Sequence, residues 1–137
     1  MSESAPNFDA LFATARRAQI RAYAPYSAFR VGAAILDDNG AIHSGCNVEN
    51  ASYPVGLCAE AGAISAMIAA GGRAIHAVLV LGDGEELVTP CGACRQRIRE
   101  FAAPETPIAI AGPDGVRARF SLAELLPASF GPANLRT

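Results

Sequence analysis

Three of the four cysteines lie in two short motifs, and each motif opens a predicted helix. Cys58 begins an alanine-rich segment that ends at a glycine pair, and Cys91 and Cys94 lie in a Pro-Cys-Gly-Ala-Cys motif at the start of the next helical segment. Residues three apart lie on one face of a helix, so the thiols of Cys91 and Cys94 can contact one ion. The positive ends of two helix dipoles favour ionised thiols at these positions. The spacing therefore predicts one metal site built from two helix starts.

The alternation of helical and extended segments predicts how the two helix starts meet. Periodicity and turn signals predict helices over residues 8–22, 59–70 and 91–101, a short helix between Ser121 and Pro127, and strands over residues 29–36, 41–47, 74–81, 107–111 and 116–120. Such an order favours an α/β fold with three layers, α/β/α, around a mixed five-stranded sheet, and we expect one domain over residues 1–137. In a βαβ arrangement, adjacent parallel strands bring successive helix N-termini side by side, so the three thiols are expected to converge.

Three sulfur ligands are the number expected of a catalytic zinc site, because structural zinc sites have four protein ligands and catalytic ones keep a position for water. Cys46 is interpreted as a small buried residue of a strand, and His43 and His76 as structural histidines outside the site. Glu60 follows Cys58 by two residues. Alone it would be read as an acid that complements the helix dipole, but beside a three-ligand zinc ion it is placed to take a proton from activated water.

Composition excludes several other kinds of chemistry. The chain has 137 residues, a net charge of -2 and 11 basic residues, all of them arginine. Without lysine there is no Schiff-base residue and no phosphate-loop lysine. A general nucleic-acid partner is not expected, because such binding depends on clustered cations. The first ten residues lack the basic and apolar stretches of a signal peptide, and no apolar run approaches the ~20 residues of a membrane span. We therefore expect a cytoplasmic protein without a membrane partner.

The two cysteine motifs resemble those of the zinc-dependent cytidine deaminases of the small, one-domain, homotetrameric kind. Cys-Ala-Glu at residues 58–60 and Pro-Cys-Gly-Ala-Cys at residues 90–94 match the deaminase zinc pattern. Nearly the whole chain is similar to that family, most clearly over residues 26–34, 45–51, 94–96 and 125–130. The resemblance implies a cytidine deaminase-like fold, one Zn²⁺ per subunit, and hydrolytic deamination of cytidine and 2′-deoxycytidine to uridine and 2′-deoxyuridine with release of ammonia, as in pyrimidine salvage.

The resemblance also implies roles for individual residues. It places zinc on Cys58, Cys91 and Cys94 and makes Glu60 the proton shuttle. The substrate-binding positions that it implies are Phe29, Asn47, Glu49, Ala51, Tyr53, Ala59 and Phe130.

Within this set, Asn47 and Glu49 would hold the ribose, since residues i and i+2 of an extended segment point to one side. Phe29 would pack against the pyrimidine ring. Ala51, Tyr53 and Phe130 would reach the site of a neighbouring subunit in a homotetramer. From the residue pattern alone, Asn47 and Glu49 would instead satisfy backbone groups in a loop, and the two phenylalanines would fill a core or anchor the chain.

One departure from the family concerns charge. The family commonly has arginine directly after Cys-Ala-Glu, where it donates to the zinc thiolates, and this chain has Ala61 there. Three thiolates and one zinc ion carry a net negative charge, so compensation must come from helix dipoles, backbone donors or another arginine.

Three alternatives stay open at this point. The chain could deaminate another aminopyrimidine nucleoside such as blasticidin S. It could be a non-enzymatic zinc module, which a fourth protein ligand would support. It could also use its Cys-x-x-Cys motif for redox work, which predicts two titratable thiols and no metal.

Overall fold

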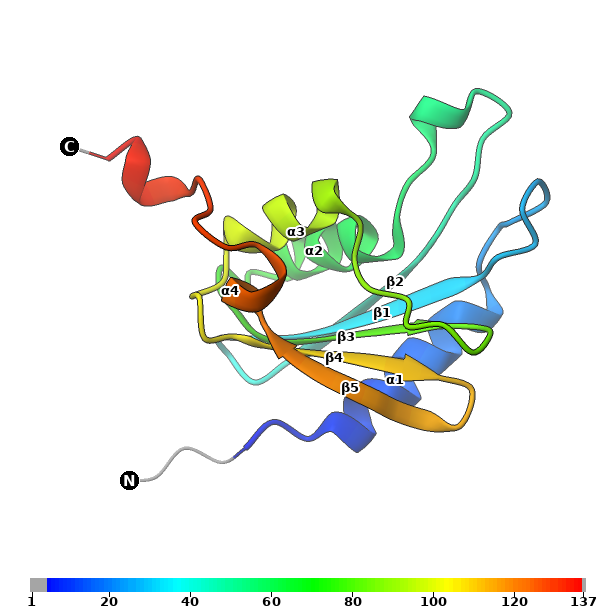
Figure 1. Cartoon of the computed structure of the whole chain (residues 1–137), viewed down its shortest axis with the longest axis horizontal. Helices are drawn as coiled ribbons and strands as arrows, with labels where there is room; N and C mark the ends of the chain where they lie inside the picture. Colours follow the sequence, from blue (N-terminus) through cyan, green and yellow to red (C-terminus); the bar gives the residue numbers. More distant parts are fainter. Residues whose placement is uncertain (1–4, 137) are drawn as a thin grey trace.

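Five strands form one continuous sheet, with helices on both of its faces (Figure 1). The structure is a computed structural model and describes residues 5–136. Its elements are α1 (Phe8–Ile20), β1 (Val31–Asp37), β2 (Ile42–Cys46), the 3-10 helix η1 (Tyr53–Val55), α2 (Ala59–Ala69), β3 (Ile75–Gly82), α3 (Gly92–Arg99), β4 (Pro107–Gly112), β5 (Gly115–Ser121), α4 (Leu122–Leu125) and the 3-10 helix η2 (Pro132–Asn134). The predicted mixed five-stranded α/β sheet is confirmed, with the strand order β2-β1-β3-β4-β5.

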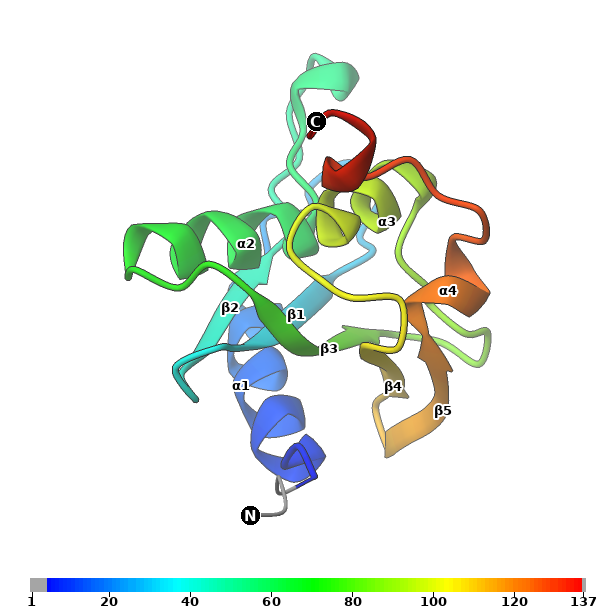
Figure 2. The ribbon, with the colours of Figure 1, turned by 90° about the vertical axis from the view of Figure 1, so that its left-hand side faces the viewer.

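The strand order corrects one step of the sequence prediction. Strand β1 pairs antiparallel with both β2 and β3, so it lies between them, and only β3 and β4 are adjacent parallel neighbours. The two helices whose N-cap residues are cysteines, α2 and α3, follow β2 and β3, which run in the same direction but are not adjacent. Their N-termini still meet at one end of the sheet, because α2 and α3 pack against each other on the same face (Figure 2).

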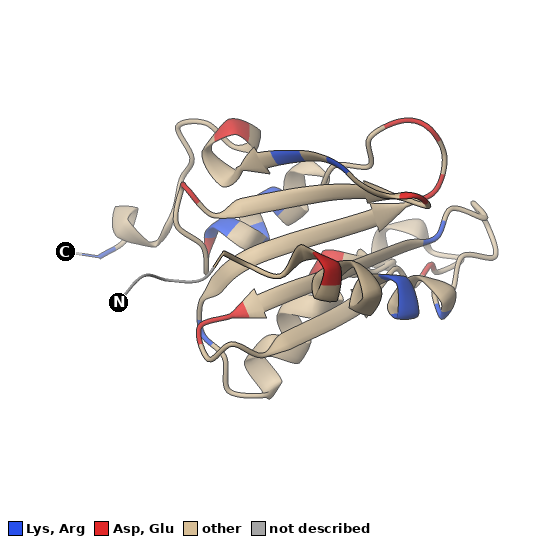
Figure 3. Cartoon of the chain, turned by 90° about the horizontal axis from the view of Figure 1, so that it is seen from below, with Lys and Arg blue, Asp and Glu red and all other residues tan. Residues whose placement is uncertain are grey.

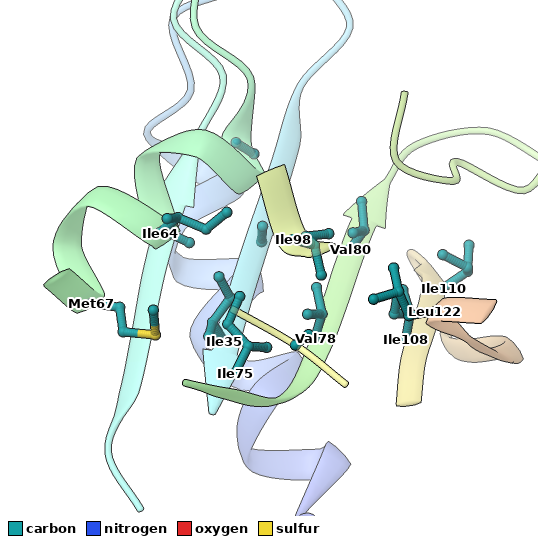
Figure 4. Close-up of a cluster of buried hydrophobic side chains, with 14 residues drawn as sticks. Ile35, Ile64, Met67, Ile75, Val78, Val80, Ile98, Ile108, Ile110 and Leu122 are labelled. Carbon is teal, nitrogen blue, oxygen red and sulfur yellow. The ribbon is translucent and has the colours of Figure 1, made fainter. Parts of the chain in front are cut away.

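Side chains alternate between two cores along the central strands, as the two-residue period of a strand requires. On one face, larger residues such as Ile35, Val78 and Ile110 pack beneath α2, α3 and α4 (Figure 4). On the other face, α1 covers a surface that includes Ala34 and Leu79. Both faces are therefore buried, which explains why β3 reads as a continuous apolar run.

Helix α1 ends at Ile20, two residues earlier than predicted, because the chain turns away to pair elsewhere. The backbone N–H of Tyr23 donates to the backbone carbonyl of Asn47 (3.0 Å), and the N–H of Glu49 donates to the carbonyl of Tyr23 (2.8 Å). On the other side of this segment, the backbone N–H of Leu57 donates to the carbonyl of Val48 (2.8 Å), and the N–H of Val48 donates to the carbonyl of Leu57 (2.9 Å). The segments before β1 and after β2 therefore extend together beyond the sheet (Figure 1).

Gly45 allows α2 to approach the sheet closely. A Cβ atom at Gly45 would overlap the backbone carbonyl of Ala59 and the backbone nitrogen of Ala63. The first turn of α2 therefore lies against the backbone of β2, and this contact sets the position of Cys58 and Glu60.

Acidic and basic positions are spread over several helices, strands and loops, with one continuous acidic stretch along a loop (Figure 3). Within residues 5–136, no helix combines the length and the apolar character that crossing a membrane requires.

Candidate metal centre and adjoining cleft

The three predicted thiols come together at the facing ends of two helices. Cys58 and Cys91 are the N-cap residues of α2 and α3, and Cys94 lies in the first turn of α3. Their three Sγ atoms all lie within 4.8 Å of one another. Sulfurs bound to one zinc ion at ~2.3 Å in tetrahedral geometry would be about 3.8 Å apart, so the cluster needs only a small contraction to bind the ion. Thiolates are ligands that zinc prefers, and the donor set fits that metal.

The remaining candidates for a fourth ligand lie elsewhere. Among the described residues, the group of possible metal ligands found here consists of Cys58, Cys91 and Cys94 alone. Cys46 is half-buried rather than buried, and it ends β2. The His43 side chain contacts Asp37 (Nε2–Oδ2, 2.7 Å), and His76 is an exposed residue of β3. Three protein ligands leave a coordination position free for a water molecule.

Burial and hydrogen bonding shift the pKa values of the three thiols in different directions. Desolvation, followed by the charge of Cys91, raises the pKa of Cys58, and desolvation followed by the charge of Glu60 raises the pKa of Cys94. Desolvation also opposes ionisation of Cys91, but hydrogen bonds from the backbone and thiol of Cys94 outweigh it and lower the pKa of Cys91. Cys91 is therefore the thiol of the cluster most easily ionised.

Glu60 lies beside the sulfurs in the first turn of α2. It follows the N-cap Cys58 by two residues, its side chain is 4% exposed, and its charge contributes to the raised pKa of both Cys58 and Cys94. Desolvation raises the pKa of Glu60 itself, although the charge of Arg97 acts in the opposite direction. A buried carboxyl group next to a three-sulfur site is the arrangement expected of a proton shuttle.

Arg97 is a member of this centre that the sequence prediction missed. Its Nη1 donates to the Sγ of Cys94 at 3.3 Å, one helical turn along α3. The spacing Cys94-Arg95-Gln96-Arg97 carries the signal that could have found it, since residues three apart share a helix face.

An open cleft of about 430 Å³ adjoins the sulfur cluster, and Cys58 is one of its walls. The other lining residues are Tyr26, Ser27, Asn47, Val48, Glu49, Asn50, Tyr53, Gly56 and Leu57. The structure thus brings the predicted residues Asn47, Glu49 and Tyr53 into one cleft with Cys58.

The side chains of Asn47 and Glu49 hold the segment before β1. The amide of Asn47 accepts from the N–H of Val31 (2.9 Å) and donates to the carbonyl of Phe29 (2.8 Å). Glu49 accepts from the backbone N–H groups of Tyr26 (3.0 Å) and Ser27 (3.1 Å) and from the Ser27 hydroxyl. The hydrogen bond from Ser27 is the largest cause of the lowered pKa of Glu49. Both side chains therefore satisfy backbone groups, as the residue pattern alone suggested.

Of the other predicted substrate-binding residues, Tyr53 lines this cleft, whereas Phe29, Ala51 and Ala59 are not among its lining residues. Phe29 lines a second hollow, with residues 83–89, and is 42% exposed. Ala51 is exposed, Tyr53 packs edge-on against Tyr26 with ring centroids 6.0 Å apart, and Ala59, the first residue of α2, is buried in the core.

Phe130 is exposed, and α3 fixes its segment. The Gln96 amide donates to the carbonyl of Phe130 (2.8 Å), and Arg99 donates to the Ser129 hydroxyl (2.9 Å). The helix that begins at two thiols of the sulfur cluster thus also positions the C-terminal segment.

The chain is similar to known deaminases in both sequence and fold. Residues 7–110 match the family described as the cytidine and deoxycytidylate deaminase zinc-binding region. The cytidine deaminase of Sporosarcina psychrophila is 41% identical over 125 residues, which cover 91% of this chain and 92% of that protein. The crystal structure of cytidine deaminase from Burkholderia pseudomallei has a TM-score of 0.84 and 41% identity, covering 91% of this chain and 100% of that one. The structure from Mycobacterium leprae has a TM-score of 0.76 and 42% identity, covering 90% and 99%.

Proposed function

Because the chain belongs to the cytidine and deoxycytidylate deaminase zinc-binding family, we propose that it hydrolyses the amino group of cytidine and 2′-deoxycytidine, giving uridine, 2′-deoxyuridine and ammonia. The observation that carries this proposal is the cluster of Cys58, Cys91 and Cys94 with the buried Glu60 beside it. These three sulfurs would hold one Zn²⁺, which when bound would lower the pKa of a water molecule to about 7 and so supply a nucleophile at neutral pH.

Glu60 handles the protons of the reaction. Its carboxylate takes one proton from the attacking water and delivers it to ring nitrogen 3, which makes ring carbon 4 more electrophilic. The water oxygen forms a bond to ring carbon 4. Glu60 then transfers the second proton of that water to the amino group, the carbon–nitrogen bond breaks, and ammonia leaves. The product keeps a carbonyl at carbon 4 and a proton on nitrogen 3.

Asn47 and Glu49 hold the ribose with the hydrogen-bonding capacity that their backbone contacts leave. An amide has two N–H donors, and one of those of Asn47 is used by Phe29. A carboxylate has about four acceptor positions, and three donors from Tyr26 and Ser27 occupy Glu49. One donor and one acceptor thus remain for ribose hydroxyls, on two side chains that line the same cleft.

The remaining predicted substrate-binding residues are assigned by resemblance. Phe29 packs against the pyrimidine, and Ala59, whose side chain is buried, contributes through its backbone. Ala51, Tyr53 and Phe130 contact the site of a neighbouring subunit in a homotetramer. This assembly is supported by their exposure, which is 74% for Tyr53 and 57% for Phe130. The single domain over residues 1–137, the cytoplasmic location and the role in pyrimidine salvage belong to the same proposal.

The direct test is an absorbance assay of the purified protein with cytidine and 2′-deoxycytidine, before and after treatment with a zinc chelator. We expect turnover that the chelator abolishes and added zinc restores. Free cytosine should be a poor substrate, because it offers nothing to Asn47 and Glu49, and blasticidin S should be deaminated more slowly than cytidine. Turnover of blasticidin S alone would overturn the choice of substrate, and metal-independent activity would overturn the role of the sulfur cluster.

A further inference from the structure

We infer that Arg97 is a positioning residue that neutralises the negative charge of the three-thiolate centre through its contact with Cys94. Three thiolates around one Zn²⁺ leave one net negative charge, and Ala61 supplies no cation from α2. The inference rests on the zinc binding of the proposed function, and it concerns what this chain's own residues do to the metal ligands.

The geometry of α3 directs Arg97 to the cluster. Arg97 follows Cys94 by one helical turn, and its Nη1 lies 3.3 Å from a sulfur that is itself buried. The guanidinium remains charged at any physiological pH, and it can donate to the sulfur without a change in protonation. A hydrogen bond to a fully buried thiolate is a strong, charge-assisted one.

Arg97 and the thiols of the cluster affect one another's pKa values. The pKa of Arg97 is raised chiefly by its hydrogen bond to Cys94, with further contributions from the charges of Cys94, Cys58 and Cys91. In return, Arg97 acts against the rise in the pKa of Cys94 and of Glu60. The inference itself rests on the 3.3 Å contact between Arg97 Nη1 and the Cys94 sulfur, and these effects agree with it.

The neighbouring arginines of α3 have other partners. Arg95 donates to the carbonyls of Pro90 (2.7 Å) and Leu125 (2.8 Å), and Arg99 donates to Ser129 (2.9 Å). Of the three arginines on this helix, Arg97 is therefore the one directed at sulfur. Position 61 has the same relation to Cys58 that Arg97 has to Cys94, because each lies three residues after a zinc ligand.

The test compares Arg97→Gln with the wild-type protein and with Arg16→Gln, which removes an exposed arginine of α1. Loss of an outer partner of a metal ligand typically weakens metal binding about 10- to 100-fold, so we expect R97Q to bind zinc at least about 10-fold more weakly in a chelator competition. In the cobalt-substituted protein, the sulfur-to-cobalt charge-transfer band should move to longer wavelength, because an unneutralised thiolate gives up its electrons more easily. R16Q should match the wild type in both measurements.

Two further variants separate charge from packing. Arg97→Lys keeps the charge and should bind zinc more tightly than R97Q, and Ala61→Arg in the R97Q background supplies a cation one turn from Cys58 and should recover part of the lost affinity. The inference is overturned if R97Q keeps zinc affinity within twofold of the wild type with its cobalt band in place, or if R97K is as weak as R97Q. Both readouts are taken without substrate, so a failure of the proposed deamination would leave them unchanged.

Discussion

The Ser27 hydroxyl joins two residues of the candidate site, since it donates a hydrogen bond to Glu49 and accepts one from the backbone N–H of Phe29 (2.9 Å). Between Ser27 and Phe29, Ala28 adopts a left-handed conformation, with φ at 58°, which is uncommon for a residue other than glycine. Ser27 therefore holds both the carboxylate proposed to bind the ribose and the backbone of Phe29, whose ring is proposed to contact the pyrimidine.

We predict that Ser27→Ala raises the KM for cytidine more than it lowers kcat. The variant loses one donor to Glu49, so the carboxylate is less well oriented toward the ribose, whereas the sulfur cluster and Glu60 are untouched. An effect of about fivefold on KM is expected for one hydrogen bond. Steady-state kinetics with cytidine measure both parameters.

Ser52→Ala provides the control for this variant. Ser52 precedes η1, and its side chain makes no capping hydrogen bond there. Its removal should leave KM unchanged. A Ser27→Ala enzyme with unchanged KM, or with a loss confined to kcat, would contradict the positioning role of Ser27.

A matched pair of glycines tests how the sheet positions the zinc ligands. We predict that Gly45→Ala lowers the free energy of unfolding by about 1–3 kcal/mol, because its Cβ would overlap the backbone of α2. Since that helix carries Cys58 and Glu60, G45A should also lose zinc affinity and activity. Urea denaturation and a chelator competition measure the two effects.

Gly62→Ala places a methyl group in the same interface from the helix side. Its Cβ would lie 3.6 Å from the Cα of Gly45, an ordinary contact, and alanine favours a helix over glycine by about 0.5–1 kcal/mol. G62A should therefore be as stable as the wild type or more so. Equal stability of G45A and the wild type would refute the close approach of β2 and α2.

The convergence of three thiols is the part of the site that local spacing could predict. Cys91 and Cys94 share a helix face wherever that helix lies, and the N-cap positions of Cys58 and Cys91 follow from the same local pattern. The sulfur cluster was predicted correctly although the supposed adjacency of the strands was wrong, because β1 enters the sheet between β2 and β3.

The contacts that orient the site depend on long-range packing, and local periodicity does not specify them. Asn47 bonds to the backbone 16 and 18 residues away, and Glu49 bonds to Ser27, 22 residues away. Predicting these pairs requires knowing that Tyr23 and Leu57 flank Val48. The role of Arg97 is not evident from the sequence for a different reason, since it is the middle one of three arginines on a short helix and, like an ordinary surface cation, it is exposed.

Asp37 should make the stability of the fold depend on pH in the acid range. Its carboxylate is 2% exposed and accepts from the N–H groups of Asn39 (2.8 Å) and Ala41 (2.9 Å) while contacting His43. Burial opposes ionisation, but these hydrogen bonds outweigh it and hold the pKa of Asp37 below its usual 3.8. The ionised form therefore stabilises the fold above that value, and the stabilisation is lost as pH falls through the lower pKa of the folded state.

We predict that Asp37→Asn lowers the free energy of unfolding at pH 7 by about 1–3 kcal/mol, and that the difference from the wild type shrinks between about pH 5 and pH 3. Urea denaturation of both proteins at several pH values measures this difference. Any loss of metal at low pH affects the two proteins equally and therefore does not change the difference between them. Asp114→Asn, at a side chain 77% exposed, should show no such trend. A constant difference between D37N and the wild type across this range would contradict the assignment.

Replacing Glu60 should separate catalysis from metal binding. We predict that Glu60→Gln lowers kcat by more than about 100-fold, because an amide cannot take the proton of the attacking water or pass it to the substrate. The three sulfurs are unchanged, so the zinc content should stay at one per chain. Because burial raises the pKa of Glu60, its ionised form is disfavoured in the fold, and the neutral glutamine should not lower the melting temperature. An E60Q protein with near-normal kcat and full zinc content would show that another group moves the protons.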